Sequence, residues 1–223
     1  YKKGMINGLL TSYHPNGNIK EKAYYQKNLI NGLSEAYALS GDTMYYIEYA
    51  EGIPNGIYKT FYDNGKPKER AFKKNDNYYG TFQSFYENGQ LEKSFHYNDS
   101  LQIDGKYLSF HENSELAVNC LYKNGAIDGE WIEYYDNKAI KEIGIFDMGQ
   151  RIGNWKMFYP DSSLYIKGDY KNGSKEGLWE LFFPNGNYKQ LGKFSQGLAQ
   201  GEWEFYYPNG DVKSKGVFID DLQ

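Results

Sequence analysis

The sequence predicts an all-β protein: an elongated single-layer antiparallel β-meander built from about nine repeats of 24 residues, with two strands in each. Glycine recurs every 24 residues with a single step of 25, which indicates a repeat architecture. The glycines that start the copies are Gly8, Gly32, Gly56, Gly80, Gly105, Gly129, Gly153, Gly177 and Gly201. Aromatic residues make up 18% of the chain and stand at fixed distances from these glycines. No window shows the 3.6-residue apolar period of a helix, so we expect almost no helix.

Each copy opens with a short run rich in Trp, Tyr and Phe, which is typical of a β-strand. An aromatic residue stands at the fifth position after every start glycine, from Tyr13 to Tyr206. The second position carries a ring in seven copies: Tyr58, Phe82, Tyr107, Trp131, Trp155, Trp179 and Trp203. Because side chains alternate between faces along a strand, we expect the second and sixth positions on one face and the fifth on the other.

A turn cluster follows the first strand, and Asn stands at its centre in seven of the nine copies. The sequence Pro-Asn-Gly at 184–186 and 208–210 is an example. We expect Asn and Gly there because a tight hairpin needs positive φ. Ser114, Lys138 and Ser162 stand where the hairpin glycine is expected, which should weaken those turns.

A second run follows each turn, mixes charged and β-forming residues, and usually ends on an aromatic residue before a Gly-, Asn- or Asp-containing loop. The third copy is irregular, because Phe72 stands one residue early and the loop after it is expected to be one residue longer. Pro67 cannot donate a ladder hydrogen bond. We therefore expect strand 66–72 to begin with a bulge or a late pairing.

The nine copies are expected to form one array over residues 1–223. Residues 1–8 match residues 122–129, which lie inside a copy, and repeat arrays need capped ends. We therefore expect the array to be part of a longer chain.

Composition and motifs favour binding over catalysis. The net charge is -4 with scattered Lys and Arg, so no basic surface for nucleic acid is expected, and no stretch is apolar enough for a transmembrane helix. His14 and His111 stand at the sixth position, where Tyr is usual, and are interpreted as ring substitutes. Cys120 is interpreted as a small apolar filler. No nucleophile motif, phosphate loop or metal-ligand spacing occurs, so we expect no enzyme, no catalytic residues, no metal and no cofactor.

The pattern Gly-x-Trp-x-x-Tyr-Tyr-x-Asn-Gly, with the loop that follows it, resembles the MORN repeat in the variant form common in bacterial proteins. The resemblance covers the whole chain. It implies an elongated single-layer sheet with a shallow groove that serves as a binding or tethering surface. Some bacterial members of the family are described as antitoxins.

Three function classes stay open. The first is a non-enzymatic protein-interaction scaffold or accessory subunit of a bacterial complex, because a long repetitive surface offers many contacts and its sheet edges can accept a strand. The second is glycan or cell-wall binding through aromatic rows, which exposed rings would favour and packed rings would oppose. The third is lipid-surface tethering. The partner is expected to be a protein of unknown identity, in the cell envelope (periplasm or outer membrane), with the cytoplasm as the alternative.

The candidate binding surface consists of rings at the second and sixth positions. These are Tyr58, Phe82, Tyr107, Trp131, Trp155, Trp179, Trp203, Tyr62, Tyr86, Tyr135, Tyr159 and Tyr207. The competing interpretation is that the same rings form the core, each stacking on its counterpart one repeat away.

Overall fold

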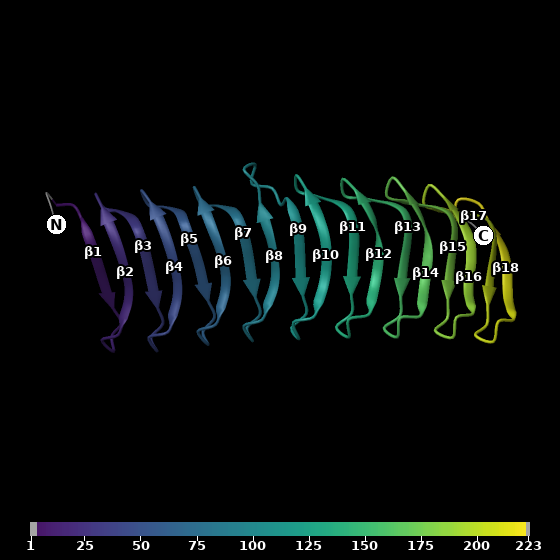
Figure 1. Cartoon of the computed structure of the whole chain (residues 1–223), viewed down its shortest axis with the longest axis horizontal. Helices are drawn as coiled ribbons and strands as arrows, with labels where there is room; N and C mark the ends of the chain where they lie inside the picture. The colour runs from purple at the N-terminus through teal and green to yellow at the C-terminus, as the bar shows by residue number, and fades with distance from the viewer. Residues whose placement is uncertain (1–3, 222–223) are drawn as a thin grey trace. The chain divides into compact units, whose positions relative to one another are not determined.

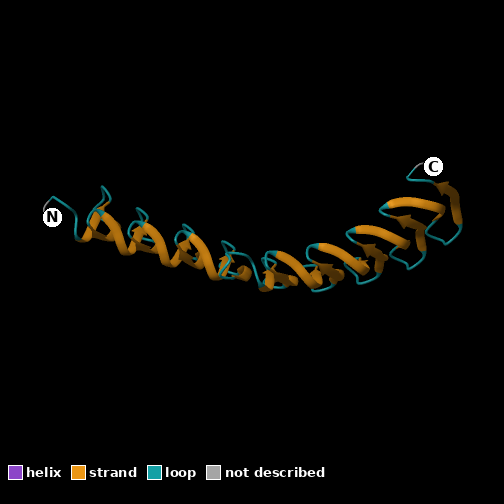
Figure 2. Ribbon diagram, turned by 90° about the horizontal axis from the view of Figure 1, so that it is seen from above, coloured by secondary structure: helices purple, strands orange, loops and turns teal. Residues whose placement is uncertain are grey.

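The computed structural model describes residues 4–221, which contain eighteen β-strands and no helix (Figures 1 and 2). The chain divides into two compact units: unit 1 comprises Tyr1–Gly105 and Glu112–Ser114, and unit 2 comprises Lys106–His111 and Glu115–Gln223. The expected match of residues 1–8 with residues 122–129 includes residues 1–3, which lie outside the described range. A single continuous array over residues 1–223 stays a prediction.

Unit 1 is an antiparallel meander in which each strand pairs with its sequence neighbours. Its strands are β1 (Gly8–Tyr13), β2 (Ile19–Gln26), β3 (Leu29–Tyr37), β4 (Thr43–Ala50), β5 (Ile53–Phe61), β6 (Pro67–Lys74), β7 (Asn77–Phe85) and β8 (Leu91–Tyr97).

Unit 2 repeats the same arrangement. Its strands are β9 (Gly105–Phe110) apart from the first residue, β10 (Leu116–Lys123), β11 (Ala126–Tyr134), β12 (Ile140–Asp147), β13 (Gln150–Phe158), β14 (Leu164–Lys171), β15 (Ser174–Phe182), β16 (Tyr188–Ser195), β17 (Leu198–Tyr206) and β18 (Val212–Phe218). The predicted fold class, a single-layer antiparallel meander of two-strand repeats, is confirmed within each unit.

The pairing of the third copy differs from the expectation. β6 begins at Pro67, which pairs with Phe61 next to a register shift. The same shift recurs in a copy without proline, between Glu133 and Tyr134, so proline is not its cause. The expectation for Phe72 was wrong: Gly56 pairs with Lys73 as Gly32 pairs with Tyr49, so the register is unchanged. Phe72 therefore lies on the face of the sheet opposite Tyr58. The loop after Phe72 does not contain the extra residue that was expected.

The hairpin turns depend on glycine and asparagine for different reasons. Gly186 closes a β-turn by donating to the carbonyl of Phe183 at 2.9 Å and adopts a φ of 84°. Ser114, Lys138 and Ser162 adopt φ values of 70°, 72° and 69° at the equivalent place, where a side chain is strained. The turn Asn does not take positive φ, so that part of the expectation was wrong.

The turn asparagines instead link neighbouring copies. Asn185 accepts a hydrogen bond from the amide of Asn187 at 3.1 Å, which stabilises its own turn. Its Nδ2 donates to the carbonyl of Pro208, in the next turn, at 2.7 Å. Asn64 and Asn137 use their amides in the same two ways. Each such asparagine therefore fastens its turn to the following one.

Candidate functional site

The second-position rings lie on one face of each unit, which we call the ring face. In unit 2, Trp155 and Trp179 are only 1% exposed. The sequence predicted that each ring stacks on its counterpart one repeat away, and this prediction was wrong. An aromatic residue of the second strand stands between the two rings. Tyr170 contacts Trp155 and Trp179 edge to face, with ring centroids 5.9 and 5.1 Å apart. Phe194 continues the row to Trp203 at 5.0 Å.

A small residue lies beneath each buried tryptophan ring. A Cβ atom at Gly168 would lie 2.3 Å from the ring of Trp179, and Gly144 is in the same relation to Trp155. Cys120 takes this place opposite Trp131 and is buried, which confirms its role as a small apolar filler. Burial raises the pKa of the Cys120 thiol to about 11, so it stays protonated near neutral pH. The sequence analysis missed this column, although a small residue eleven positions before the ring signals it.

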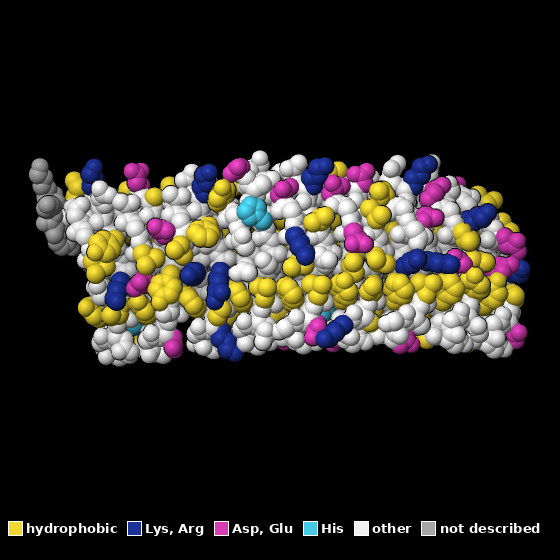
Figure 3. Space-filling model, viewed as in Figure 1, with side chains coloured by type: hydrophobic (Ala, Val, Ile, Leu, Met, Phe, Trp, Pro, Cys, Tyr) yellow, Lys and Arg dark blue, Asp and Glu magenta, His cyan; other side chains and the backbone are white. Residues whose placement is uncertain are grey.

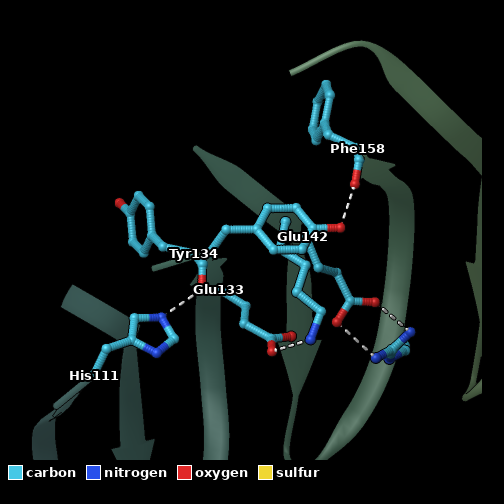
Figure 4. A network of polar contacts seen from close by, with 8 residues as sticks. His111, Glu133, Tyr134, Glu142 and Phe158 are labelled. Carbon is cyan, nitrogen blue, oxygen red and sulfur yellow. Dashed lines mark hydrogen bonds and ion pairs between the residues drawn. The ribbon is translucent and has the colours of Figure 1, made fainter. Parts of the chain in front are cut away.

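The sixth position carries a structural hydrogen bond. Tyr135 donates from its hydroxyl to the carbonyl of Phe158 at 2.8 Å (Figure 4). Tyr159 donates in the same way to the carbonyl of Phe182 at 2.9 Å. His111 uses Nε2 toward the carbonyl of Tyr134 at 3.0 Å, which is the acceptor at the equivalent place. His14 contacts the carbonyl of Tyr37 in the same manner at 2.9 Å. The interpretation of these histidines as ring substitutes is therefore confirmed.

A cavity of about 330 Å³ lies on the ring face of unit 2, and four charged side chains line it together with apolar ones. Figure 4 shows the polar contacts of these charged residues. Its charged residues come from three consecutive strands. The sixth-position ring Tyr135 and the fifth-position ring Phe158, which were expected on opposite faces, both line it. Lys141 donates to Glu133 at 2.7 Å. Arg151 donates from Nη2 to Glu142 at 3.0 Å, with Nη1 2.8 Å from the other carboxylate oxygen. Each carboxylate thus has its own cation.

Glu142 is the one buried charged side chain among the described residues. Burial raises its pKa, and the Arg151 guanidinium only partly opposes that shift. Arg151 also lies over the ring of Trp155, with its guanidinium carbon 4.1 Å from the ring centroid. Glu21 and Glu69 stand at the place of Glu142 in other copies, but none of the described copies has a second arginine at the place of Arg151, where the next copies have Lys175 and Ala199. The pair is therefore specific to one copy, and its charges are balanced within the cavity.

The candidate rings differ in what they can present to a ligand. Four of them, Phe82, Trp155, Trp179 and Trp203, are buried, and only Tyr207 is exposed. The other seven are half-buried: Tyr58, Tyr62, Tyr86, Tyr107, Trp131, Tyr135 and Tyr159. This packing favours the core interpretation for the four buried rings and opposes glycan stacking on them. Ligand contact by the remaining rings stays a prediction.

An open single-layer sheet of repeats, with its rings packed together, defines a repeat-type binding module. Within residues 4–221 no group of His, Cys, Asp and Glu could hold a metal ion, and no helix is long and apolar enough to cross a membrane. The chain belongs to the MORN repeat variant family. The family model matches residues 6–27, 54–75, 78–99, 103–124, 127–147, 151–172, 175–196 and 199–220. MORN repeats are generally protein- or lipid-binding modules rather than enzymes.

Comparison with curated proteins finds no match. Among solved structures, the chain is similar to part of a chain in the crystal structure of TcdB2-TccC3-Cdc42, at 10% identity with a TM-score of 0.17. The match covers 95% of this chain and spans 17% of that chain.

Proposed function

We propose that the chain is a non-enzymatic protein-interaction scaffold, or an accessory subunit, of a bacterial complex in the cell envelope. The observation that carries this proposal lies on the face opposite the ring face, which we call the open face (Figure 3). Tyr24 and Phe72 are 53% and 52% exposed on the open face of unit 1, and Leu33 and Ile57 are exposed between them. Contiguous exposed apolar side chains are typical of protein-interaction surfaces.

Register places these side chains in one row across the strands, which Glu48 on β4 interrupts between Leu33 and Ile57. Ile57 on β5 pairs with Phe72 on β6, and Leu9 on β1 pairs with Tyr24 on β2. Their neighbours along each strand point to the ring face and pack there. The open face can therefore receive a partner without disturbing the core.

The alternatives have less support. Glycan stacking would need exposed rings at the tryptophan column, where Trp155, Trp179 and Trp203 are buried. An anionic lipid surface would repel a chain with a net charge of -4. Binding as an antitoxin would be a special case of protein interaction. The envelope location is proposed from the resemblance to bacterial variant MORN proteins.

The test is mild affinity purification of the full-length protein from its source, with membrane and soluble fractions kept apart, followed by cross-linking and mass spectrometry. We expect a stoichiometric protein partner, from the membrane or periplasmic fraction, cross-linked to the open face. Recovery of the protein alone from every fraction would contradict the scaffold function.

Paired variants locate the interaction. Tyr24→Asp with Ile57→Asp disrupts the open face of unit 1, and Ile145→Asp with Leu178→Asp changes the matching positions of unit 2. All four side chains are exposed, so both variants should fold. Loss of the partner in one variant identifies the unit that binds. Full binding in both would show that the open face is not the interface.

A further inference from the structure

The open face of unit 1 holds two cations directly opposite each other. Lys59 on β5 pairs with Arg70 on β6, and both are exposed. Like charges in a cross-strand pair destabilise a sheet. Among the salt bridges of residues 4–221, none includes Lys59, Arg70 or the nearby Lys74. Arg70 instead lies over the ring of Phe85, with its guanidinium carbon 4.9 Å from the ring centroid, so no carboxylate neutralises the two opposed charges.

Unit 2 also places two cations opposite each other at these positions, Lys156 and Lys167, but there a carboxylate accompanies them. Lys167 and Lys215 occupy the place of Arg70 in later copies. Lys167 lies 2.8 Å from Glu180 on the following strand, and Lys215 forms an ion pair with Glu204 on the preceding strand. In unit 1, the places of these two glutamates hold Gln83 and Lys59. The third copy therefore lacks the carboxylate that accompanies the equivalent cations of other copies.

An apolar hollow adjoins the cations. Phe72 stands on the open face because Lys73 takes the ring-face position, where its ammonium lies 3.8 Å from the centroid of Tyr78. The hollow measures about 740 Å³ and is lined by Phe72, Tyr79, Thr81 and His96, among others. A Cβ atom at Gly80, which also lines it, would meet nothing within 4 Å. Ligand pockets are commonly of this size.

The polar groups around the hollow favour an anionic ligand. Lys74 lies at its rim with its ammonium 5.0 Å from the ring centroid of Tyr79. The one carboxylate in the lining, Glu48, accepts a hydrogen bond from the amide of Ile57 at 3.1 Å. Figure 3 shows Lys and Arg side chains beside hydrophobic ones over β5 to β7. Apolar area and positive charge therefore occur together at this place.

We propose that the open face over β5 to β7 binds an acidic segment of a partner protein. The segment places one aromatic or aliphatic side chain against Phe72 and its carboxylates beside Lys59, Arg70 and Lys74. An anchor in a pocket surrounded by complementary charge is the usual form of an interaction hot spot. This inference rests on the proposed scaffold function and names the chemistry of the partner. The hollow favours a side-chain anchor over a flat membrane surface.

The first experiment measures fluorescence anisotropy with the intact protein and short labelled peptides in which Asp and Glu flank a central Phe, Trp, Leu or Ile. We expect at least one acidic peptide to bind, and we expect its affinity to fall as the salt concentration rises. Peptides with Lys in place of each acid should not bind. Absence of binding by every acidic peptide, or equal binding of the lysine peptides, would overturn the proposal.

Two variants test the residues. The double variant Lys59→Gln with Arg70→Gln should lower the affinity for the acidic peptide about tenfold or more. Phe72→Ser should lower it by a similar factor. The matched control, Ile145→Ser with Lys156→Gln at the places of Phe72 and Lys59 in unit 2, should bind as the wild type does. Lys59→Gln alone should raise the midpoint of thermal unfolding, because it removes the like-charge pair. Unchanged peptide affinity in both binding variants would overturn the proposal.

Two further readouts separate this inference from its alternatives. Vesicles of phosphatidylcholine with phosphatidylserine should not bind; vesicle binding that depends on Lys59 and Arg70 would assign the cluster to lipid and overturn the proposal. A captured partner whose cross-links fall on another surface would leave the scaffold function standing and reject this site. Cross-links of acidic residues to Lys59 or Lys74 would support it.

Discussion

Replacing Trp179 with alanine is the sharpest test of the ring face as core. The side chain is 1% exposed, contacts Tyr170 and Phe194 edge to face, and donates from Nε1 to the carbonyl of Asp169 at 3.2 Å. Burying roughly 200 Å² of aromatic surface at about 25 cal/mol per Å² gives about 5 kcal/mol. Replacing a buried aromatic residue with alanine typically lowers the free energy of unfolding by about 3–5 kcal/mol, and we expect a loss in that range for Trp179→Ala.

The assay must report locally, because repeat arrays need not unfold as one cooperative unit. Hydrogen exchange resolved by peptide measures the opening free energy of each strand. We expect the protection of β14, β15 and β16 to fall most in Trp179→Ala. Strands of unit 1 should keep the exchange rates of the wild type.

The matched control is Leu178→Ala, one residue away on the open face, where the side chain is 44% exposed. We expect it to change stability by less than about 0.5 kcal/mol. A cost below about 1 kcal/mol for Trp179→Ala would refute the packing argument. Loss of a ligand with unchanged exchange would instead support Trp179 as a binding residue.

Three other predictions follow from the ring face and its cavity. Gly168→Ala should lower the free energy of unfolding in urea by about 1–3 kcal/mol, since its Cβ would lie 2.3 Å from the Trp179 ring. The same substitution should cost much less in the Trp179→Ala background. Additive effects of the two substitutions would contradict the contact. Tyr159→Phe should lower the free energy of unfolding by about 1 kcal/mol through loss of its bond to the Phe182 carbonyl, and an unchanged urea midpoint would count against that bond. The raised pKa of Glu142 means that the folded state binds its proton more tightly, so wild-type stability falls as pH rises from the unfolded value of 4.5 through the raised pKa. Glu142→Gln should therefore melt progressively higher than wild type between pH 4 and 7, and a constant difference in melting temperature would contradict this sign.

The periodic features of the fold could be predicted from sequence because they recur. The start glycines and the fifth-position rings appear in every copy, so strand order and the ring columns follow from the pattern alone. The substitution of His111 for Tyr could also be interpreted correctly, since its column was known. Alternation along the strand then assigned each column to a face.

Features that depend on pairing could not be predicted in this way. Phe72 looked like an early strand end until the register placed it opposite Ile57 and on the open face. The meeting of Lys59 with Arg70 requires the register across a turn that contains an irregularity. The burial of Glu142 beside Arg151 could not be predicted, because nothing in its local sequence distinguishes it from an exposed strand charge.

The turn asparagines have a consequence for how such a chain can change length. Asn137 and Asn185 each carry the donor for the following copy, and the acceptor is a backbone carbonyl that any sequence supplies. A copy duplicated in tandem therefore brings its own fastening, and no new complementary side chain must arise. Gain or loss of a whole 24-residue unit keeps every donor opposite an acceptor, whereas a change of a few residues within a copy does not. Duplication and deletion of entire copies are thus the changes in length that this fold tolerates best.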